Sequence, residues 1–187
     1  MSLKILFSDQ ERPYTGVELR PHFLLTELGL KGSAVGAFIG PCQVKTEHMV
    51  DWEDRLNHDH IAARSMVHFL GEFFGITLRE GVLAQRLFVA IAQQALNARL
   101  EKFAVVRDGD DLFWDRKKLT VSIVTASPVS QLLHFGINID SAGAPVAAAG
   151  LKDLGVDPAE WASEVLKLFC DEWESLEWAC AKVRPVV

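Results

Sequence analysis

The 187-residue sequence has few cysteines, no excess of basic charge and no long apolar run. Its three cysteines, Cys42, Cys170 and Cys180, are odd in number and widely spaced, which argues against a disulfide framework and against a Cys-x-x-Cys metal or redox site. The 19 basic and 25 acidic side chains leave a formal charge of −6. Phosphate partners require clustered Lys and Arg, so we expect neither nucleic acid nor an anionic membrane as a partner.

Targeting signals are also missing. The apolar run at the start of the sequence is too short for a signal peptide. No stretch approaches the roughly 18 apolar residues that a membrane span requires. We therefore expect a cytoplasmic, soluble protein.

What is present is a composition typical of a folded protein, with 49% hydrophobic and 24% charged residues. A single domain of this size can bury about 70% of the surface that its unfolded chain exposes. We find no internal repeat, low-complexity tract or linker. Residues 1–187 are therefore expected to form one α+β domain.

The first half of the chain predicts short strands followed by helices. Glycine and proline interrupt short apolar runs such as Val35–Gly40, which favours strands and loops, with a short helix at Glu18–Gly29. From Asn57 the apolar residues take a helical spacing that ends near Gly75. A second helix is predicted with its buried positions between Leu83 and Leu100, packed against the first.

The second half predicts a group of strands and a final helix. Four strands are expected between turns that contain Asp, Gly, Ser and Pro: Phe103–Val106, Leu112–Trp114, Leu119–Thr125 and Gln131–Ile139. In the last helix Asp157 fits the N-cap, Pro158 the first helical position and Glu160 the third residue after the cap.

The last two predicted strands suggest a pocket. Side chains alternate between faces along a strand, so Thr120 and Ser122 share one face, and His134, Gly136 and Asn138 share another. One interpretation is a sheet with a core side and a solvent side. However, charged residues are absent from positions 119–139, and a glycine would let a ligand approach the backbone closely. An uncharged polar face of this kind is typical of a small-molecule pocket.

Two segments carry a resemblance to a known fold. Residues 107–119 and 134–139 resemble the catalytic core of biotin and lipoate protein ligases, which has an Asn-Asp-Leu strand, an Arg-Lys-Leu-type turn and a Gly-Ile-Asn strand. The chain as a whole resembles a family of uncharacterised archaeal and bacterial proteins placed structurally beside those ligases. That resemblance is carried by Met49–Asp54, Met66–Phe69, Lys118–Ser130 and His134–Asn138.

The resemblance implies a biotin/lipoate ligase-like domain: a mixed, mostly antiparallel sheet backed by helices, as in class II aminoacyl-tRNA synthetases. It implies that Lys118, or Lys117 in another register, contacts the substrate carboxylate and the α-phosphate of an acyl-adenylate. Asp110 or Asp111 would match the carboxylate of the Asn-Asp-Leu strand, and Asn138 the asparagine of Gly-Ile-Asn. The chain departs from the ligases at residues 32–36, which lack the arginines of the ligase loop.

Other polar residues allow further interpretations. His68 and Glu72, four residues apart on a predicted helix, would form an ion pair. His134 ranks first among the histidines as a catalytic candidate, because it shares a strand face with Asn138. An acidic segment followed by two histidines is either a metal site or a solvated loop that caps the next helix, and the second interpretation is favoured; these residues are Asp51, Glu53, Asp54, His58 and His60.

The leading hypothesis is a pocket for a small molecule, an anionic ligand or a nucleotide, with acyl or nucleotidyl transfer as a further possibility. Lys118 and His134 are its catalytic candidates, and the ligand-binding candidates are Arg107, Asp110, Asp111, Ser122 and Asn138. No metal is assigned to the site and no cofactor is identified. We expect the protein to form a homodimer with Trp114 at the contact. One alternative function is a non-catalytic scaffold whose polar face and tryptophans serve self-association. The other is a metal-dependent hydrolase at the acidic segment.

Overall fold

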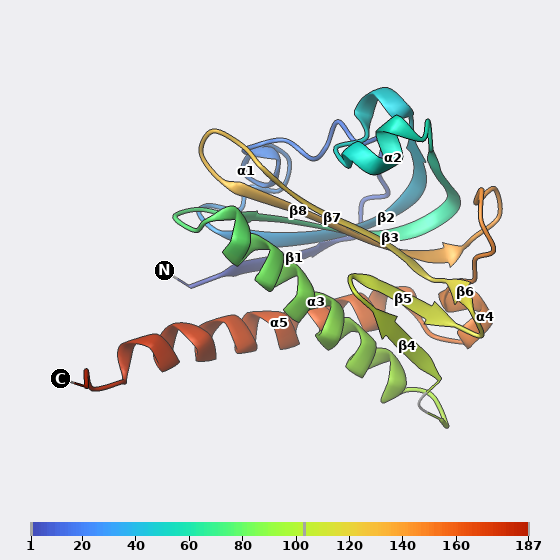
Figure 1. The fold of residues 1–187 in the computed structure, drawn as a ribbon. Helices are drawn as coiled ribbons and strands as arrows, with labels where there is room; N and C mark the ends of the chain where they lie inside the picture. Colours follow the sequence, from blue (N-terminus) through green and yellow to red (C-terminus); the bar gives the residue numbers. More distant parts are fainter. Residues whose placement is uncertain (1, 103, 187) are drawn as a thin grey trace.

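The computed structural model describes residues 2–102 and 104–186. Its main element is a five-stranded sheet in the order β1-β2-β3-β8-β7 (Figure 1). These strands are β1 (Lys4–Ser8), β2 (Ala34–Val44), β3 (Ile61–Phe73), β7 (Thr120–Ala126) and β8 (Gln131–Asp140). The pair β1–β2 is parallel and the other pairs are antiparallel, which confirms the predicted mixed sheet.

A smaller sheet and the helices surround this sheet. The small sheet has the order β4-β5-β6, with β4 (Val105–Asp108), β5 (Asp111–Trp114) and β6 (Lys117–Lys118). The helices are α1 (Phe23–Leu28), a 3-10 turn (Thr46–His48), α2 (Trp52–Leu56), α3 (Leu78–Asn97), α4 (Leu151–Leu154) and α5 (Pro158–Ala181). Figure 1 shows α3 and α5 on one face of the large sheet and α1 and α2 on the other. The described helices include none long and apolar enough to cross a membrane.

Both faces of the central strands are buried. The larger core lies between the sheet and the helices α3 and α5, where Phe69 packs edge-on against Phe88 and Trp161. The predicted apolar face of β8 points into this core, including Phe135. A second cluster on the opposite face contains Phe38. The sheet therefore separates two apolar layers, which explains why its central strands carry few charges.

The predicted helix from Asn57 to Gly75 is wrong, because most of this segment is the long strand β3. The last eight residues of β3, from Met66 to Phe73, are all buried. A strand buried on both faces is apolar without a strict alternation, so its pattern can coincide with a helical spacing. The expected pair of neighbouring helices is consequently a strand followed by α3.

The strand geometry also overturns the predicted ion pair of His68 and Glu72. Four residues of a strand span about 13 Å, whereas one helical turn would bring the two side chains together. Glu72 instead accepts hydrogen bonds from the backbone N–H of His22 at 3.0 Å and from the hydroxyl of Ser130 at 2.7 Å. This buried carboxylate therefore holds two loops onto the sheet.

The other three predicted helices are present as α1, α3 and α5, but the predicted buried face of α3 is wrong, because Leu83 is 61% exposed and Leu100 lies beyond the helix, which buries Ala84 and Phe88 instead. The carboxylate of Asp157 accepts from the backbone N–H groups of Ala159 and Glu160 at the start of α5. The short helix α1 ends at Gly29, whose φ of 69° is the left-handed conformation that glycine adopts without strain. In the predicted strand 103–106, position 103 lies outside the described residues, and β4 begins at Val105.

Candidate functional site

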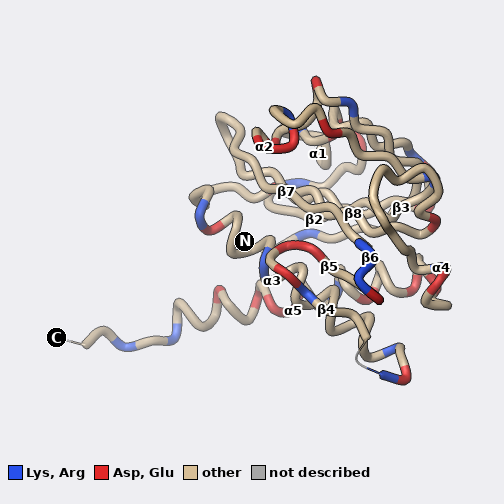
Figure 2. The backbone as a smooth tube through the Cα atoms, turned by 45° about the vertical axis from the view of Figure 1, so that its right-hand side comes forward, with Lys and Arg blue, Asp and Glu red and all other residues tan. Residues whose placement is uncertain are grey.

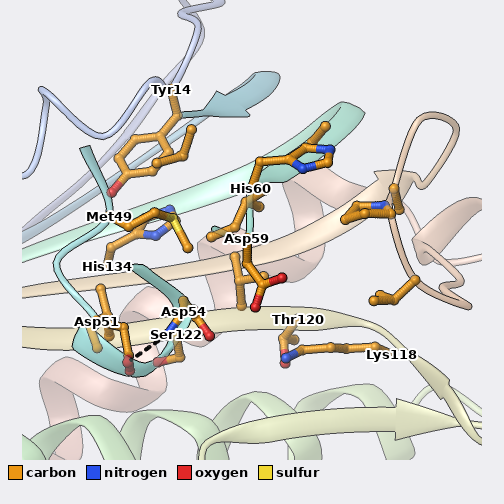
Figure 3. Close-up of a pocket in the computed structure, with 18 of the residues that line it drawn as sticks. Tyr14, Met49, Asp51, Asp54, Asp59, His60, Lys118, Thr120, Ser122 and His134 are labelled. Carbon is orange, nitrogen blue, oxygen red and sulfur yellow. Dashed lines mark hydrogen bonds between the residues drawn. The ribbon is translucent and has the colours of Figure 1, made fainter. Parts of the chain in front are cut away.

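A cavity of about 520 Å³ lies where residues 44–62 cross over the β7–β8 side of the large sheet (Figure 3). Its walls include side chains from residues 14–19, 44–62, 110–123 and 134–148. The wall is partly apolar, with Val44, Met49 and Val121, and partly polar. The volume lies within the range of about 300–1,000 Å³ that small-molecule pockets have.

The cavity gathers six of the seven predicted site residues: Asp110, Asp111, Lys118, Ser122, His134 and Asn138. The seventh, Arg107, is exposed on β4 and donates from its Nη1 to the carbonyl of Gly109 at 3.0 Å. β4 is the far strand of the small sheet, two strands and so about 10 Å from β6. Arg107 is therefore not among the residues that line this cavity.

Lys118 is paired with an acidic neighbour. Its Nζ lies 2.8 Å from Oδ2 of Asp111, and its side chain remains about one third exposed. Burial raises the pKa of Asp111, and the hydrogen bond from Lys118 opposes that rise. Lys117 is exposed and does not line the cavity, so Lys118 is the lysine that faces it.

Asp110 and Ser122 are held by helix α3. Nε2 of the buried Gln85 donates to Oδ2 of Asp110 at 3.0 Å and to Oγ of Ser122 at 2.8 Å. Arg86 adds an ion pair, with its Nη2 at 3.3 Å from Oδ1 of Asp110. Both carboxylate oxygens of Asp110 thus have partners within the protein.

The polar residues of β7 and those of β8 point to different faces of the large sheet. Ser122 pairs with Phe135, so it lies on the α3 side of the sheet, whereas His134 pairs with Ile123 on the other side. Because β7 is an edge strand, residues from both of its faces line the cavity. Ser122 and His134 therefore lie on opposite faces of the sheet, although both line one cavity with Asn138.

Gly136 and Asn138 serve the packing of the strands. A Cβ on Gly136 would lie 2.9 Å from Cε of Met66 and 3.1 Å from Cγ2 of Val121. The glycine therefore makes room for protein side chains, which fill the space that was predicted for a ligand. Nδ2 of Asn138 donates to the carbonyl of Ala149 at 3.1 Å, which ties β8 to the segment before α4.

His134 belongs to a buried group of three aromatic rings. Nδ1 of His68 lies 3.1 Å from Nε2 of His134, and the ring of Tyr14 stacks on that of His134 with the centroids 3.8 Å apart. Burial lowers the pKa of His68 to about 3, and burial together with the neighbouring His68 lowers that of His134. Both imidazoles are therefore neutral at pH 7. Sequence reasoning missed Tyr14 and misassigned His68, since no local pattern reports contacts between distant segments.

The acidic segment acts as a helix cap. Oδ1 of Asp51 accepts from the backbone N–H of Glu53 at 2.7 Å and from that of Asp54 at 3.4 Å. The favoured interpretation, a capping role, holds for Asp51, but the capped helix is α2, which contains Glu53 and Asp54, and not the expected helix from Asn57. Within residues 2–102 and 104–186, no three His, Cys, Asp or Glu side chains are grouped so that they could hold a metal ion. The metal-dependent hydrolase therefore finds no support among the described residues.

The charges that line the cavity are mostly negative. One lysine, Lys118, faces five carboxylates: Asp51, Asp54, Asp59, Asp110 and Asp111. Figure 2 shows acidic stretches around α2 and next to β5, with basic residues at β6. Burial, followed by the charges of Asp51 and Asp59, raises the pKa of Asp54. A pocket for a simple anion, the expected ligand class, would carry the opposite balance of charge.

Comparison with solved structures shows that this fold is similar to that of biotin protein ligases. A biotin protein ligase from Aquifex aeolicus, solved in complex with biotin and ATP, superimposes with a TM-score of 0.55 at 15% identity over 90% of this chain and 69% of that one. The fold is therefore ligase-like, as the sequence resemblance implies.

The chain belongs to the family described as "Domain of unknown function (DUF366)", whose model matches residues 3–184. A relative from Methanocaldococcus jannaschii, the uncharacterized protein MJ0805, is 32% identical over 99% of this chain and 86% of its own length. A solved protein of unknown function from Pyrococcus horikoshi is 34% identical and superimposes with a TM-score of 0.92 over the whole of both chains.

Proposed function

We propose that the protein binds a small molecule in the cavity between residues 44–62 and strands β6–β8. The observation that carries the proposal is the meeting of Lys118, Asp54 and Asp59 across this space. Figure 3 shows the two aspartates coming from the segment above the sheet, and Lys118 reaching along the strand below them toward Thr120. A covered cavity with opposed charges can orient a polar ligand.

The charges favour a ligand that carries both signs. Lys118 favours a ligand with a carboxylate or phosphate group, because its ammonium group donates charge-assisted hydrogen bonds to such oxygens. Asp54 and Asp59 support a cationic or N–H-rich group next to it, because an uncompensated anion would meet several carboxylates at short range. A nucleotide would face the same repulsion unless a cation accompanied it. We therefore place a zwitterionic compound ahead of a simple anion.

A thermal-shift comparison of three matched compounds tests this proposal. Pentanoate, pentylamine and the corresponding ω-amino acid have the same carbon chain and differ in their charged ends. The amino acid should raise the unfolding temperature most, because it alone carries both charges and should bind most tightly. A ligand at 100 times its Kd stabilises the native state by about 2.7 kcal/mol. The same gain with pentanoate alone would contradict the zwitterion, and no gain in any screened zwitterion would contradict the site.

Acyl or nucleotidyl transfer is the second candidate. It is favoured by the match between Lys118 and the ligase lysine and by the ligase fold, one example of which was solved with biotin and ATP. Lys118 would stabilise the charge that develops on the transferring phosphate and carboxylate oxygens. Exchange of labelled pyrophosphate into ATP in the presence of a carboxylic acid tests it. Exchange by the wild-type protein that is lost in Lys118→Ala and kept in Lys117→Ala would support adenylate formation.

A further inference from the structure

Three aromatic residues close one end of the cavity, and we refer to Tyr14, His68 and His134 as the aromatic stack. His68 is fully buried and His134 is 3% exposed, yet His134 and Tyr14 both line the cavity. Three different segments contribute these rings: the chain before α1, strand β3 and strand β8. Such a convergence of polar aromatic groups exceeds what packing alone requires.

The hydrogen bonds of the aromatic stack determine where the protons lie. Nε2 of His68 is 3.3 Å from the carbonyl oxygen of Gly40, which can only accept, so this nitrogen carries the proton. The Nδ1 of a neutral His68 is then an acceptor, and its partner at 3.1 Å, Nε2 of His134, must be the donor. The remaining nitrogen, Nδ1 of a neutral His134, is left without a proton.

This nitrogen, Nδ1 of His134, has no hydrogen-bond partner in the described part of the protein. Nor is it among the sealed polar atoms that lack a partner, which lie at Arg12, Gln131, Trp161 and Glu164. The atom is therefore unpaired and not fully sealed in a ring that borders the cavity, and the ring of Tyr14 stacks on the imidazole and holds its orientation.

We propose that Nδ1 of His134 is a fixed hydrogen-bond acceptor that selects ligands with a neutral N–H or O–H donor, and that His68 is the positioning residue that sets its tautomer. This inference rests on the proposed small-molecule site and specifies the end of the ligand opposite Lys118. An oxyanion at this end would face the lone pair of Nδ1 of His134, which repels it and offers no hydrogen-bond donor. The lowered pKa of both histidines agrees with a neutral acceptor.

The two ends of the ligand are also spaced by the sheet. His134 lies opposite Ile123, three residues along β7 from Thr120, toward which Lys118 extends (Figure 3). Three residues of a strand span about 10 Å. The ligand is therefore elongated, with its charged end at Lys118 and a neutral donor at His134.

Nitrogen NMR of the free protein, labelled with ¹⁵N-histidine and measured at pH 7, tests the tautomers directly. We expect His68 and His134 to be neutral and protonated on Nε2 only. A proton on Nδ1 of His134 would overturn the proposal. In His68→Phe, which removes the acceptor, a second population with the proton on Nδ1 of His134 should appear, and an unchanged spectrum would show that His68 positions nothing.

Carbethoxylation by diethyl pyrocarbonate, which attacks an unprotonated imidazole nitrogen, tests access from the cavity. Peptide mapping should find His134 modified, together with the exposed His58, while the buried His68 remains unmodified in the native protein. Modification of His58 without His134 would overturn the proposal, because a ligand in the cavity could not reach Nδ1. Neither measurement uses the ligand, so their failure is distinguishable from failure of the thermal-shift screen.

Discussion

Nζ of Lys118 lies 2.8 Å from Oδ2 of Asp111, and this pair joins two strands of the small sheet at the wall of the cavity. The backbone of Lys118 is fixed as well, since its N–H donates to the carbonyl of Ala147 and its own carbonyl accepts from Ala149. The side chain is therefore held in place before any ligand arrives. A ligand carboxylate or phosphate would share the ammonium with Asp111.

Lys118→Ala should fold normally and lose ligand binding. Partly exposed ion pairs contribute about 1 kcal/mol or less, so the unfolding temperature should fall by no more than roughly 2–4 °C. The ligand-induced thermal shift should disappear at the same time. Lys117→Ala, at the neighbouring exposed position, is the matched control and should keep that shift. An equal loss of binding in both variants would show that overall charge, rather than this contact, is responsible.

The His68–His134 hydrogen bond predicts non-additive effects on stability. Either His68→Phe or His134→Phe leaves a buried nitrogen without its partner, which costs about 1–3 kcal/mol. The double variant removes both polar groups, so it should be less destabilised than the sum of the single variants. Denaturant unfolding of the four proteins gives the coupling energy. Strict additivity would mean that the two rings do not interact.

Asp54 predicts a dependence of stability on pH. Its pKa is raised in the folded protein, so the native state holds this proton more tightly than the unfolded chain does. The contribution of Asp54 to stability therefore falls as pH rises from the ordinary carboxyl range through the raised pKa. Asp54→Asn should be more stable than the wild-type protein at pH 7, and the difference should shrink in acid.

Removing the N-cap of α5 should lower the stability of the protein without affecting ligand binding. Asp157→Ala removes the acceptor for two backbone N–H groups and should cost about 1 kcal/mol of unfolding free energy. Asp157→Asn keeps a capping oxygen and should cost less. Ligand binding should be unaffected in both variants, because α5 does not line the cavity. Weaker binding at unchanged stability would contradict this separation of roles.

Local signals account for the parts of the fold that the sequence predicts correctly. The cap residues of α5, the turn sequences between β4 and β8 and the apolar alternation of β8 all act over a few residues. The long strand β3 was misassigned because it is buried on both faces, and its apolar spacing then imitates a helix. A local pattern cannot report what covers a strand.

Some residues of the candidate site could be predicted from local patterns, and others could not. Resemblance and strand alternation found Lys118, Asp111 and His134, which the cavity brings together. Arg107 does not line the cavity, because its side chain is exposed on β4, and the side of a small sheet to which a residue points depends on tertiary packing. Tyr14 was missed because it reaches His134 only through the fold.

Native mass spectrometry of gently purified protein tests whether a small molecule binds through Lys118. We expect a small-molecule adduct on the wild-type protein and on Lys117→Ala, and its loss from Lys118→Ala. An adduct of the same mass and occupancy on Lys118→Ala would show that Lys118 does not bind the ligand.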